Sequence, residues 1–123
     1  MIGHYQGNVA AARRSWAAAN KDKVVAYIRA YVEAIDWLYD RANRDGAVRI
    51  LRKNLPQMSQ DLAERSYDEL LDPQDGFFRQ GRVDMAGLKT VLELRSRYGK
   101  PTKNLADPMK YYDPAYHAAA IGK

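Results

Sequence analysis

Few side chains in this sequence have the types and spacing that catalysis or metal binding requires. The two histidines, His4 and His117, lie near opposite ends of the chain, whereas a metal site needs clustered His, Cys, Asp or Glu ligands. No serine stands in a Gly-x-Ser-x-Gly turn, and the glycines are too dispersed for a phosphate-binding loop. The absence of cysteine excludes disulfides and thiol nucleophiles. We therefore predict no catalytic activity, no metal site and no cofactor.

Two groups of charged residues remain as candidates for binding. The acidic residues Asp68, Glu69 and Asp72 are expected at the end of a helix. Paired carboxylates do acid/base chemistry only in a cleft that perturbs their ionisation, so we interpret these three as surface residues. Arg13 and Arg14 are adjacent cations, and they could meet either an anionic ligand or a neighbouring carboxylate.

Composition places the chain among ordinary globular domains. It has 123 residues, of which 46% are hydrophobic and 28% charged, and this suits one domain and argues against intrinsic disorder. No apolar run approaches the roughly 18 residues of a membrane span, and no basic-then-apolar leader is visible at the N-terminus. The net charge is +5, but acidic residues are interleaved with the basic ones, so we predict no nucleic-acid partner.

Hydrophobic periodicity predicts a mainly α chain of four to five helices. Apolar residues in steps of three and four predict an amphipathic helix of about 18 residues that Asn20 caps, with Glu33 and Asp36 on its solvated face. A second helix is expected from near Asn43 to just before Pro56, because proline disfavours helix in the residue before it.

Three further helices have clear start signals. Ser59 and Asp84 are N-cap candidates, and Asp113 followed by proline predicts a short last helix through Ala120. A turn at residues 72–76, rich in Asp, Pro and Gly, separates the third and fourth helices. The chain is thus expected to comprise a possible strand or hinge segment at 1–14, a helical body at 20–99 and a tail with the short terminal helix at 100–123.

The expected core is thin. Aliphatic residues are few, many apolar residues are alanine, and nine tyrosines supply much of the remaining apolar area. Tyrosine packs its ring and keeps its hydroxyl at a wet edge, so these residues either complete a small core or face another protein. The residues expected to face inward on the third helix are Leu62, Ala63, Tyr67, Leu70 and Leu71. On the fourth helix, the residues expected to align on one face are Leu88, Val91, Leu92 and Tyr98.

A succession of short motifs runs along nearly the whole chain. The motifs are Tyr5-Gln6-Gly7-Asn8-Val9, Arg13-Arg14-Ser15-Trp16, Trp37-Leu38-Tyr39-Asp40, Ala42-Asn43-Arg44, Ser66-Tyr67, Leu70-Leu71-Asp72-Pro73, Gly76-Phe77-Phe78, Gly81-Arg82-Val83-Asp84, Gly87-Leu88-Lys89, Asp107-Pro108 and Tyr111-Tyr112-Asp113. Each is weak alone, but their order and spacing resemble the C-terminal part of a family of ABC-transporter substrate-binding proteins. This is the nitrate, sulfonate, taurine and bicarbonate group, whose fold is shared with the thiamine-pyrimidine synthases.

The resemblance implies that the chain is the C-terminal portion of a two-lobe α/β fold, that of the type II periplasmic binding proteins. Proteins of this family are longer than 123 residues, so we expect the chain to be a fragment. The lack of a leader, the thin core and a first segment that reads as a lone strand would follow. The segment from Tyr5 to Arg13 should then pair with another chain, lose its strand form or join a helix.

The resemblance also implies a function. The full-length protein would lie in the periplasm, or otherwise outside the cytoplasm, and close its lobes around a small anionic ligand. It would then deliver the ligand to the membrane permease of an ABC importer. Tyr5, Gln6 and Arg13 lie closest to the expected cleft, as ligand-binding residues or else as hinge and strand residues. The related synthases use a cysteine-rich signature, which this chain lacks.

One alternative stays open from the residues alone. The chain could be an independent helical domain that uses its tyrosine-rich face for protein interaction or self-association, without catalysis. A fragment, too, should form homo-oligomers or exchange segments, because apolar faces shaped for another part of the protein would be exposed.

Overall fold

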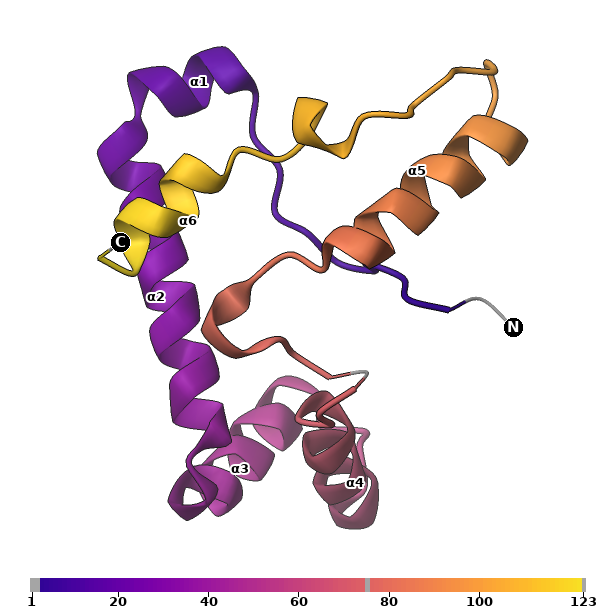
Figure 1. Ribbon diagram of the computed structural model, residues 1–123. Coiled ribbons are helices and arrows are strands. Elements are labelled where there is room, and N and C mark those ends of the chain that lie inside the picture. The colour runs from indigo at the N-terminus through magenta and orange to yellow at the C-terminus, as the bar shows by residue number, and fades with distance from the viewer. Residues whose placement is uncertain (1–2, 75, 123) are drawn as a thin grey trace. The chain divides into compact units, whose positions relative to one another are not determined.

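The computed structural model describes residues 3–74 and 76–122, and these residues form helices and connecting segments without any strand (Figure 1). The prediction of a mainly α chain is therefore confirmed. The α-helices of the described residues are α1 (Arg14–Ala19), α2 (Lys21–Tyr39), α3 (Arg44–Asn54), α4 (Gln60–Leu70), α5 (Met85–Tyr98) and α6 (Pro114–Ala120). The described part of the chain also contains three short 3₁₀-helices, which lie between the α-helices: η1 (Arg41–Asn43), η2 (Arg79–Gly81) and η3 (Pro108–Lys110).

Three helices begin at the caps that the sequence predicts. The Ser59 hydroxyl accepts a hydrogen bond from the Leu62 amide at 3.2 Å. The carboxylates of Asp84 and Asp113 each accept one from the amide two residues on, at 3.0 Å. These bonds satisfy amides of the first helical turn that have no partner within the helix. The caps of α4, α5 and α6 are thus confirmed.

Asn20 does not act as the predicted cap. α2 begins at the next residue, but the Asn20 side chain donates to the Trp16 carbonyl at 3.0 Å and accepts from Lys23 Nζ at 3.0 Å. Asn20 is instead the C-cap residue of α1, and its side-chain amide bonds to a carbonyl of that helix. α1, a short helix of Arg-Ser-Trp-Ala-Ala-Ala, is not among the helices predicted from the sequence.

The first segment forms no strand. Residues 5–13 lie in irregular structure before α1, which is one of the three outcomes expected for them. A strand needs a partner for its backbone groups, and the described residues offer none.

The chain divides into two compact units, and each is described by itself. The first unit comprises Met1–Ile28 and Arg82–Lys123, and the second comprises Arg29–Gly81. The division therefore falls within α2. The first unit joins an early part of the chain to its late part, and the second is continuous in sequence.

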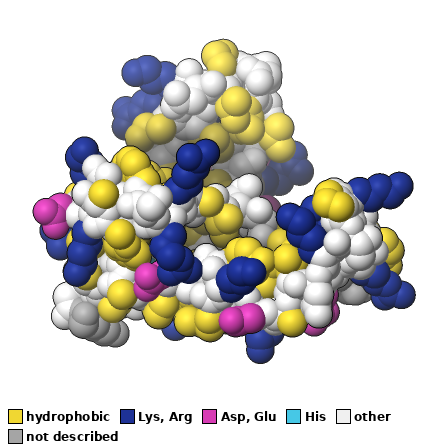
Figure 2. All heavy atoms as spheres, turned by 90° about the horizontal axis from the view of Figure 1, so that it is seen from above, with side chains coloured by type: hydrophobic (Ala, Val, Ile, Leu, Met, Phe, Trp, Pro, Cys, Tyr) yellow, Lys and Arg dark blue, Asp and Glu magenta, His cyan; other side chains and the backbone are white. Residues whose placement is uncertain are grey.

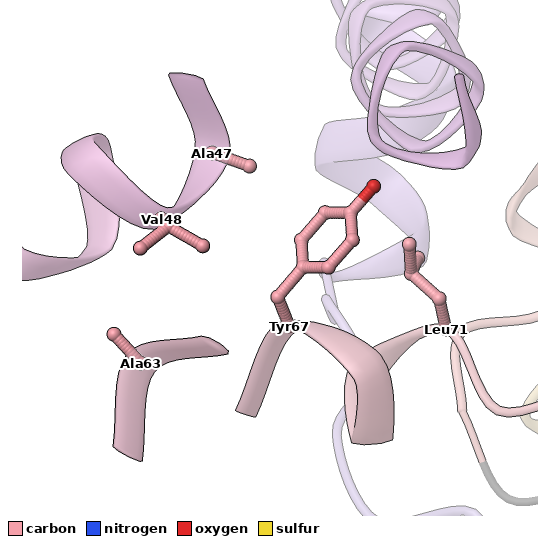
Figure 3. Close-up of a cluster of buried hydrophobic side chains, with 5 residues drawn as sticks. All are labelled: Ala47, Val48, Ala63, Tyr67 and Leu71. Carbon is pink, nitrogen blue, oxygen red and sulfur yellow. The ribbon is translucent and has the colours of Figure 1, made fainter. Parts of the chain in front are cut away.

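The core of the second unit lies between α3 and α4 (Figure 3). α3 contributes Ala47 and Val48, α4 contributes Ala63 and Tyr67, and Leu71 follows directly after α4. Ala63 is fully buried and Tyr67 is 2% exposed. The Tyr67 hydroxyl donates to the Leu38 carbonyl at 2.7 Å, so its polar end is satisfied at the edge of the core.

Two leucines expected in this core are exposed instead. Leu62 is 44% and Leu70 is 39% exposed, so the prediction that they face inward is wrong. Residues 63, 67 and 71 form one row along α4, and residues 62, 66 and 70 form the neighbouring row. α3 covers the first row only, so the second row remains at the surface.

A tight turn follows α4 near the end of the second unit. The Gln74 amide donates to the Asp72 carboxylate at 2.8 Å, and the Gly76 amide donates to the Asp72 carbonyl at 3.0 Å. A Cβ on Gly76 would lie 2.6 Å from the Asp72 nitrogen, so glycine is required for this close approach. The predicted turn is confirmed except at Asp75, which lies outside the described residues. The Phe77 carbonyl then accepts from the Tyr39 hydroxyl at 2.7 Å.

In the first unit, polar contacts fold the chain back at the end of α5. The Arg95 guanidinium lies where a Cβ of Gly99 would be and donates to the carbonyls of Lys100 and Pro101, both at 3.3 Å. The Ser96 hydroxyl accepts from the Leu105 amide at 2.9 Å. The segment after α5 is therefore tied to that helix, and η3 lies in contact with α5. Tyr98, which the apolar pattern of this helix includes, is 68% exposed, because the returning segment is tied to the Arg95–Ser96 side.

Many large apolar side chains remain at the surface in both units. Among the described residues no large side chain has an exposure below 2%. At least 37% exposed are Tyr5, Val9, Trp16, Tyr27, Tyr31, Trp37, Ile50, Leu55, Leu62, Leu70, Phe78, Tyr98, Met109 and Tyr111. None of the described helices has the length and apolar character needed to cross a membrane.

Candidate functional site

Gln6, one of the three predicted ligand-binding residues, is held against the start of α5. Its side-chain oxygen accepts a hydrogen bond from the Asp84 amide at 2.8 Å, and its side-chain nitrogen donates to the Asn8 carbonyl at 3.1 Å. The contact with Asp84 joins residues 78 positions apart in sequence. Both ends of the Gln6 amide are thus engaged within the chain, so this residue positions the first segment.

Gly87 allows this close approach. A Cβ at Gly87 would lie 2.6 Å from the Gln6 backbone nitrogen and 2.9 Å from the Tyr5 carbonyl carbon. Real Cβ atoms do not tolerate such distances, so only glycine lets the first segment lie on α5. His4 extends the junction, with its Nδ1 atom 3.3 Å from Oδ2 of Asp84.

Tyr5 projects from the same junction. Its backbone lies against Gly87, while the residue is 54% exposed. The phenol hydroxyl forms no hydrogen bond with the described residues, so it is available to an external group. The structure therefore brings Tyr5 and Gln6 together on α5, with one exposed and the other engaged.

Arg13 and Arg14 have different surroundings. Arg14 donates to the Lys110 carbonyl at 3.0 Å and approaches the Asp113 carboxylate at 3.8 Å. For Arg14 the neighbouring carboxylate, one of the two predicted alternatives, is present. Arg13 is the residue before α1, is exposed, and forms no ion pair or side-chain hydrogen bond with the described residues. No hydrogen bond or ion pair joins Arg13 to Tyr5 or Gln6 within that part of the chain.

Of the acidic residues predicted at the end of α4, Asp68 belongs to an ion-pair network. Asp68 accepts from Arg41 at 3.0 Å and lies 3.6 Å from Arg44, whose guanidinium is also 3.6 Å from Glu64. Both guanidinium groups lie near the Tyr67 ring, at 5.6 and 5.9 Å from its centroid. The Asp68 side chain is more than half exposed. The network therefore lies at the surface beside the core of the second unit and forms no enclosed acid pair.

A shallow groove runs beside α5 in the first unit. It has a volume of about 540 Å³ and lies between the helix and the segment that returns along it. Its polar lining includes Lys89, Glu93, Arg97 and Lys103. The shape of this groove could not be predicted from the sequence, because only the fold brings its two walls together. The excess of basic over acidic residues at 85–104 is the signal that could have pointed to it.

A second groove follows the surface row of α4. It has a volume of about 430 Å³ and lies beside the exposed Leu62 and Leu70, with Leu51 and Met58 completing its apolar wall. Figure 2 shows that apolar side chains also reach the surface elsewhere, between Lys and Arg side chains that are spread over the visible face.

The described residues contain no cluster of three or more His, Cys, Asp or Glu side chains that could bind a metal ion. No family model, no curated protein and no solved structure matches the chain. The features that can bind a partner are the Tyr5–Gln6 junction, Arg13 and the two grooves.

Proposed function

We propose that this chain is the C-terminal portion of a solute-binding protein that captures a small anionic ligand outside the cytoplasm. The full-length protein delivers the ligand to the membrane permease of an ABC importer, without catalysis. The present chain supplies helices and one ligand-facing segment, residues 5–13, to a type II periplasmic-binding-protein fold. Support comes from the order of motifs in the sequence and from the surface of the helices.

The observation that carries the proposal is what the helices bury and what they leave exposed. Buried positions are often small, as at Ala17, Ala47 and Ala63, whereas Tyr27 and Trp37 on α2 are 59% and 40% exposed. Large aromatic side chains contribute most when they are buried. Helices that expose them while burying alanine are typical of surfaces that lie against further protein.

Within the proposed site, the three predicted residues have different roles. Gln6 fixes the segment on α5 through its two hydrogen bonds. The Tyr5 phenol and the Arg13 guanidinium have no partner among the described residues and supply contacts to the ligand. A free guanidinium donates paired hydrogen bonds to planar or tetrahedral oxyanions, so carboxylate, sulfonate, nitrate and bicarbonate are the expected ligand groups.

A second candidate function is self-association of an independent helical domain. The apolar groove formed by Leu51, Met58, Leu62 and Leu70 favours it, because an exposed leucine row can be covered by another protein surface. The two functions differ in the size of the gene product and in small-molecule binding.

The first test measures the gene product in its own cell. An epitope tag is placed after Lys123 at the chromosomal locus, and the tagged polypeptide is analysed by immunoblot after osmotic shock. We expect a polypeptide well above the 14.0 kDa of this chain, released with the extracytoplasmic fraction. A tagged product of 14.0 kDa that stays with the cell body would overturn the proposal.

The second test measures binding by the full-length product. Calorimetric titrations use nitrate, taurine and bicarbonate, because one anion should bind in preference to the others. Arg13→Gln should weaken binding about tenfold or more through loss of a charge-assisted contact. Arg49→Gln is the matched control, since Arg49 is an exposed arginine on α3. Equal binding by both variants contradicts the role of Arg13, and failure of all three anions to bind contradicts the ligand class.

A further inference from the structure

A group of positively charged side chains lies beside α5. Residues 85–104 contain five Lys and Arg and one Glu, a net charge of +4. Three of these cations, Lys89, Arg97 and Lys103, line the groove of about 540 Å³, and none forms an ion pair with the described residues. The three cations that line the groove make it a site of attraction for anions.

The second wall of the groove offers unpaired backbone groups. Leu105 is fixed to α5 through the Ser96 hydroxyl. The backbone amides and carbonyls of Thr102, Lys103, Asn104 and Ala106 have no hydrogen-bond partner in the described part of the chain. An extended peptide laid along this segment can pair with such groups, as strands do when they add to a free edge.

The positions of the charged residues on α5 determine how far apart acidic side chains on a bound peptide should be. Lys89 and Arg97 are eight residues apart, or about 12 Å along a helix that rises 1.5 Å per residue, and Glu93 lies midway. An extended peptide covers about 12 Å in roughly four residues, and alternate side chains share one face. Acidic side chains at peptide positions 1 and 5 therefore reach the two cations. A side chain at position 3 faces Glu93 and should not be acidic.

We propose that this groove binds an extended, acidic peptide segment of a partner protein, with acidic side chains four residues apart and a basic or neutral one midway. Lys89 and Arg97 bind the two carboxylates, Glu93 selects the middle residue, and the backbone around Lys103 pairs with the peptide. A nucleic acid fits the groove less well, because its evenly spaced phosphates would place a negative charge at Glu93. The groove lies within the first unit, so this inference does not depend on the proposed transport function.

The test titrates the 123-residue chain into fluorescein-labelled peptides and follows anisotropy. The probe Ser-Glu-Thr-Lys-Thr-Glu-Ser is compared with Ser-Glu-Thr-Glu-Thr-Glu-Ser, which carries more negative charge but an acidic middle residue. We expect the lysine-centred probe to bind about tenfold more tightly, and Glu93→Lys to reverse this order. Attraction by net charge alone would favour the glutamate-centred probe in the parent chain, and that result would overturn the proposal.

Matched variants locate the site. The double variant Lys89→Gln/Arg97→Gln should weaken binding of the lysine-centred probe about tenfold. The double variant Arg49→Gln/Lys53→Gln removes the same charge from exposed positions of α3 and should leave binding within about twofold. Equal losses in the two variants would contradict a site on α5. Oligothymidylate is the competitor, and displacement of the probe by a lower concentration of it than of unlabelled peptide would identify the groove as a nucleic-acid site.

Discussion

The second unit buries a connected group of side chains, whereas the first unit buries side chains that do not cluster and relies on polar contacts. In the second unit Tyr67 and Leu71 are enclosed by α3 and α4. In the first, Ala17, Leu92 and Ala120 are buried without forming such a cluster among the described residues. Instead, the contacts of Gln6 and Arg14 join its early and late segments, and the Ser96 contact ties the segment after α5 to that helix.

This difference bears on how each unit should unfold. A connected apolar core loses many contacts together, so it resists opening as one body. Single hydrogen bonds and exposed ion pairs each contribute about 1 kcal/mol or less, and salt screens the ion pairs. We therefore expect the second unit to set the main unfolding transition, and the first unit to open locally and to respond to salt.

The largest expected effect is at Tyr67. Tyr67→Ala removes a ring that is 2% exposed and the hydrogen bond to the Leu38 carbonyl. Its cavity should lower the free energy of unfolding by about 3–5 kcal/mol. Urea unfolding followed by far-UV circular dichroism measures this change.

Two further tyrosine variants test whether that effect comes from the core. Tyr98→Ala truncates the same side chain at a position that is 68% exposed and should change stability by about 0.5 kcal/mol or less. Tyr67→Phe keeps the ring and should cost about 1 kcal/mol through the lost hydrogen bond; it also gives a measurement if Tyr67→Ala does not fold. Similar losses for Tyr67→Ala and Tyr98→Ala would mean that α3 and α4 lack the core described.

Mutations of the helix caps should affect the two units differently. Asp84→Ala removes a cap bond and the His4 contact at the start of α5, and Ser59→Ala removes the cap of α4. Each should cost about 1–2 kcal/mol. Hydrogen exchange should show faster exchange throughout α3 and α4 for Ser59→Ala, but only near residues 84–88 for Asp84→Ala. The comparison fails if the exchange change is equally local in both variants.

Two glycine substitutions should differ in sign. Gly87→Ala places a Cβ 2.6 Å from the Gln6 nitrogen, a clash of about 1–3 kcal/mol that outweighs a helix-propensity gain of about 1 kcal/mol. Gly46→Ala in α3 meets the Trp37 ring at 3.5 Å and the end of the Arg49 side chain at 3.8 Å, both ordinary contacts, and should raise stability by about 0.5–1 kcal/mol. The thermal midpoint measures both, and exchange of the Asp84 amide reports whether the first segment has left α5. Equal gains from both substitutions would contradict the Gly87 junction.

The sequence predicts helix ends better than it predicts which helix faces are covered. Ser59, Asp84 and Asp113 could be recognised as caps because each bonds an amide two or three residues away. Exposure of Leu62 and Leu70 could not be predicted, because it depends on where α3 lies across α4. Periodicity shows that a face is apolar and leaves its partner unspecified.

At the candidate site the sequence yields candidate residues but not their contacts. The resemblance singles out Tyr5, Gln6 and Arg13 by their place near the expected cleft, and the hydrogen bond of Gln6 depends on a backbone amide 78 residues away. Sequence spacing cannot show such a contact. The arginine pair carried two alternatives, and only the position of Asp113 beside Arg14 separates them.

The smallest predicted effect uses the adjacent arginines as each other's control. Arg14→Gln removes the hydrogen bond to Lys110 and the ion pair with Asp113, which should cost about 0.5–1 kcal/mol at low salt and less at 0.5 M salt, because both side chains are exposed. Arg13→Gln should cost close to nothing, since Arg13 has no partner among the described residues. Amide exchange in α6, measured at both salt concentrations, reports the local effect. If Arg13→Gln loosens α6 as much as Arg14→Gln does, the polar contacts described for the first unit do not join its early and late segments.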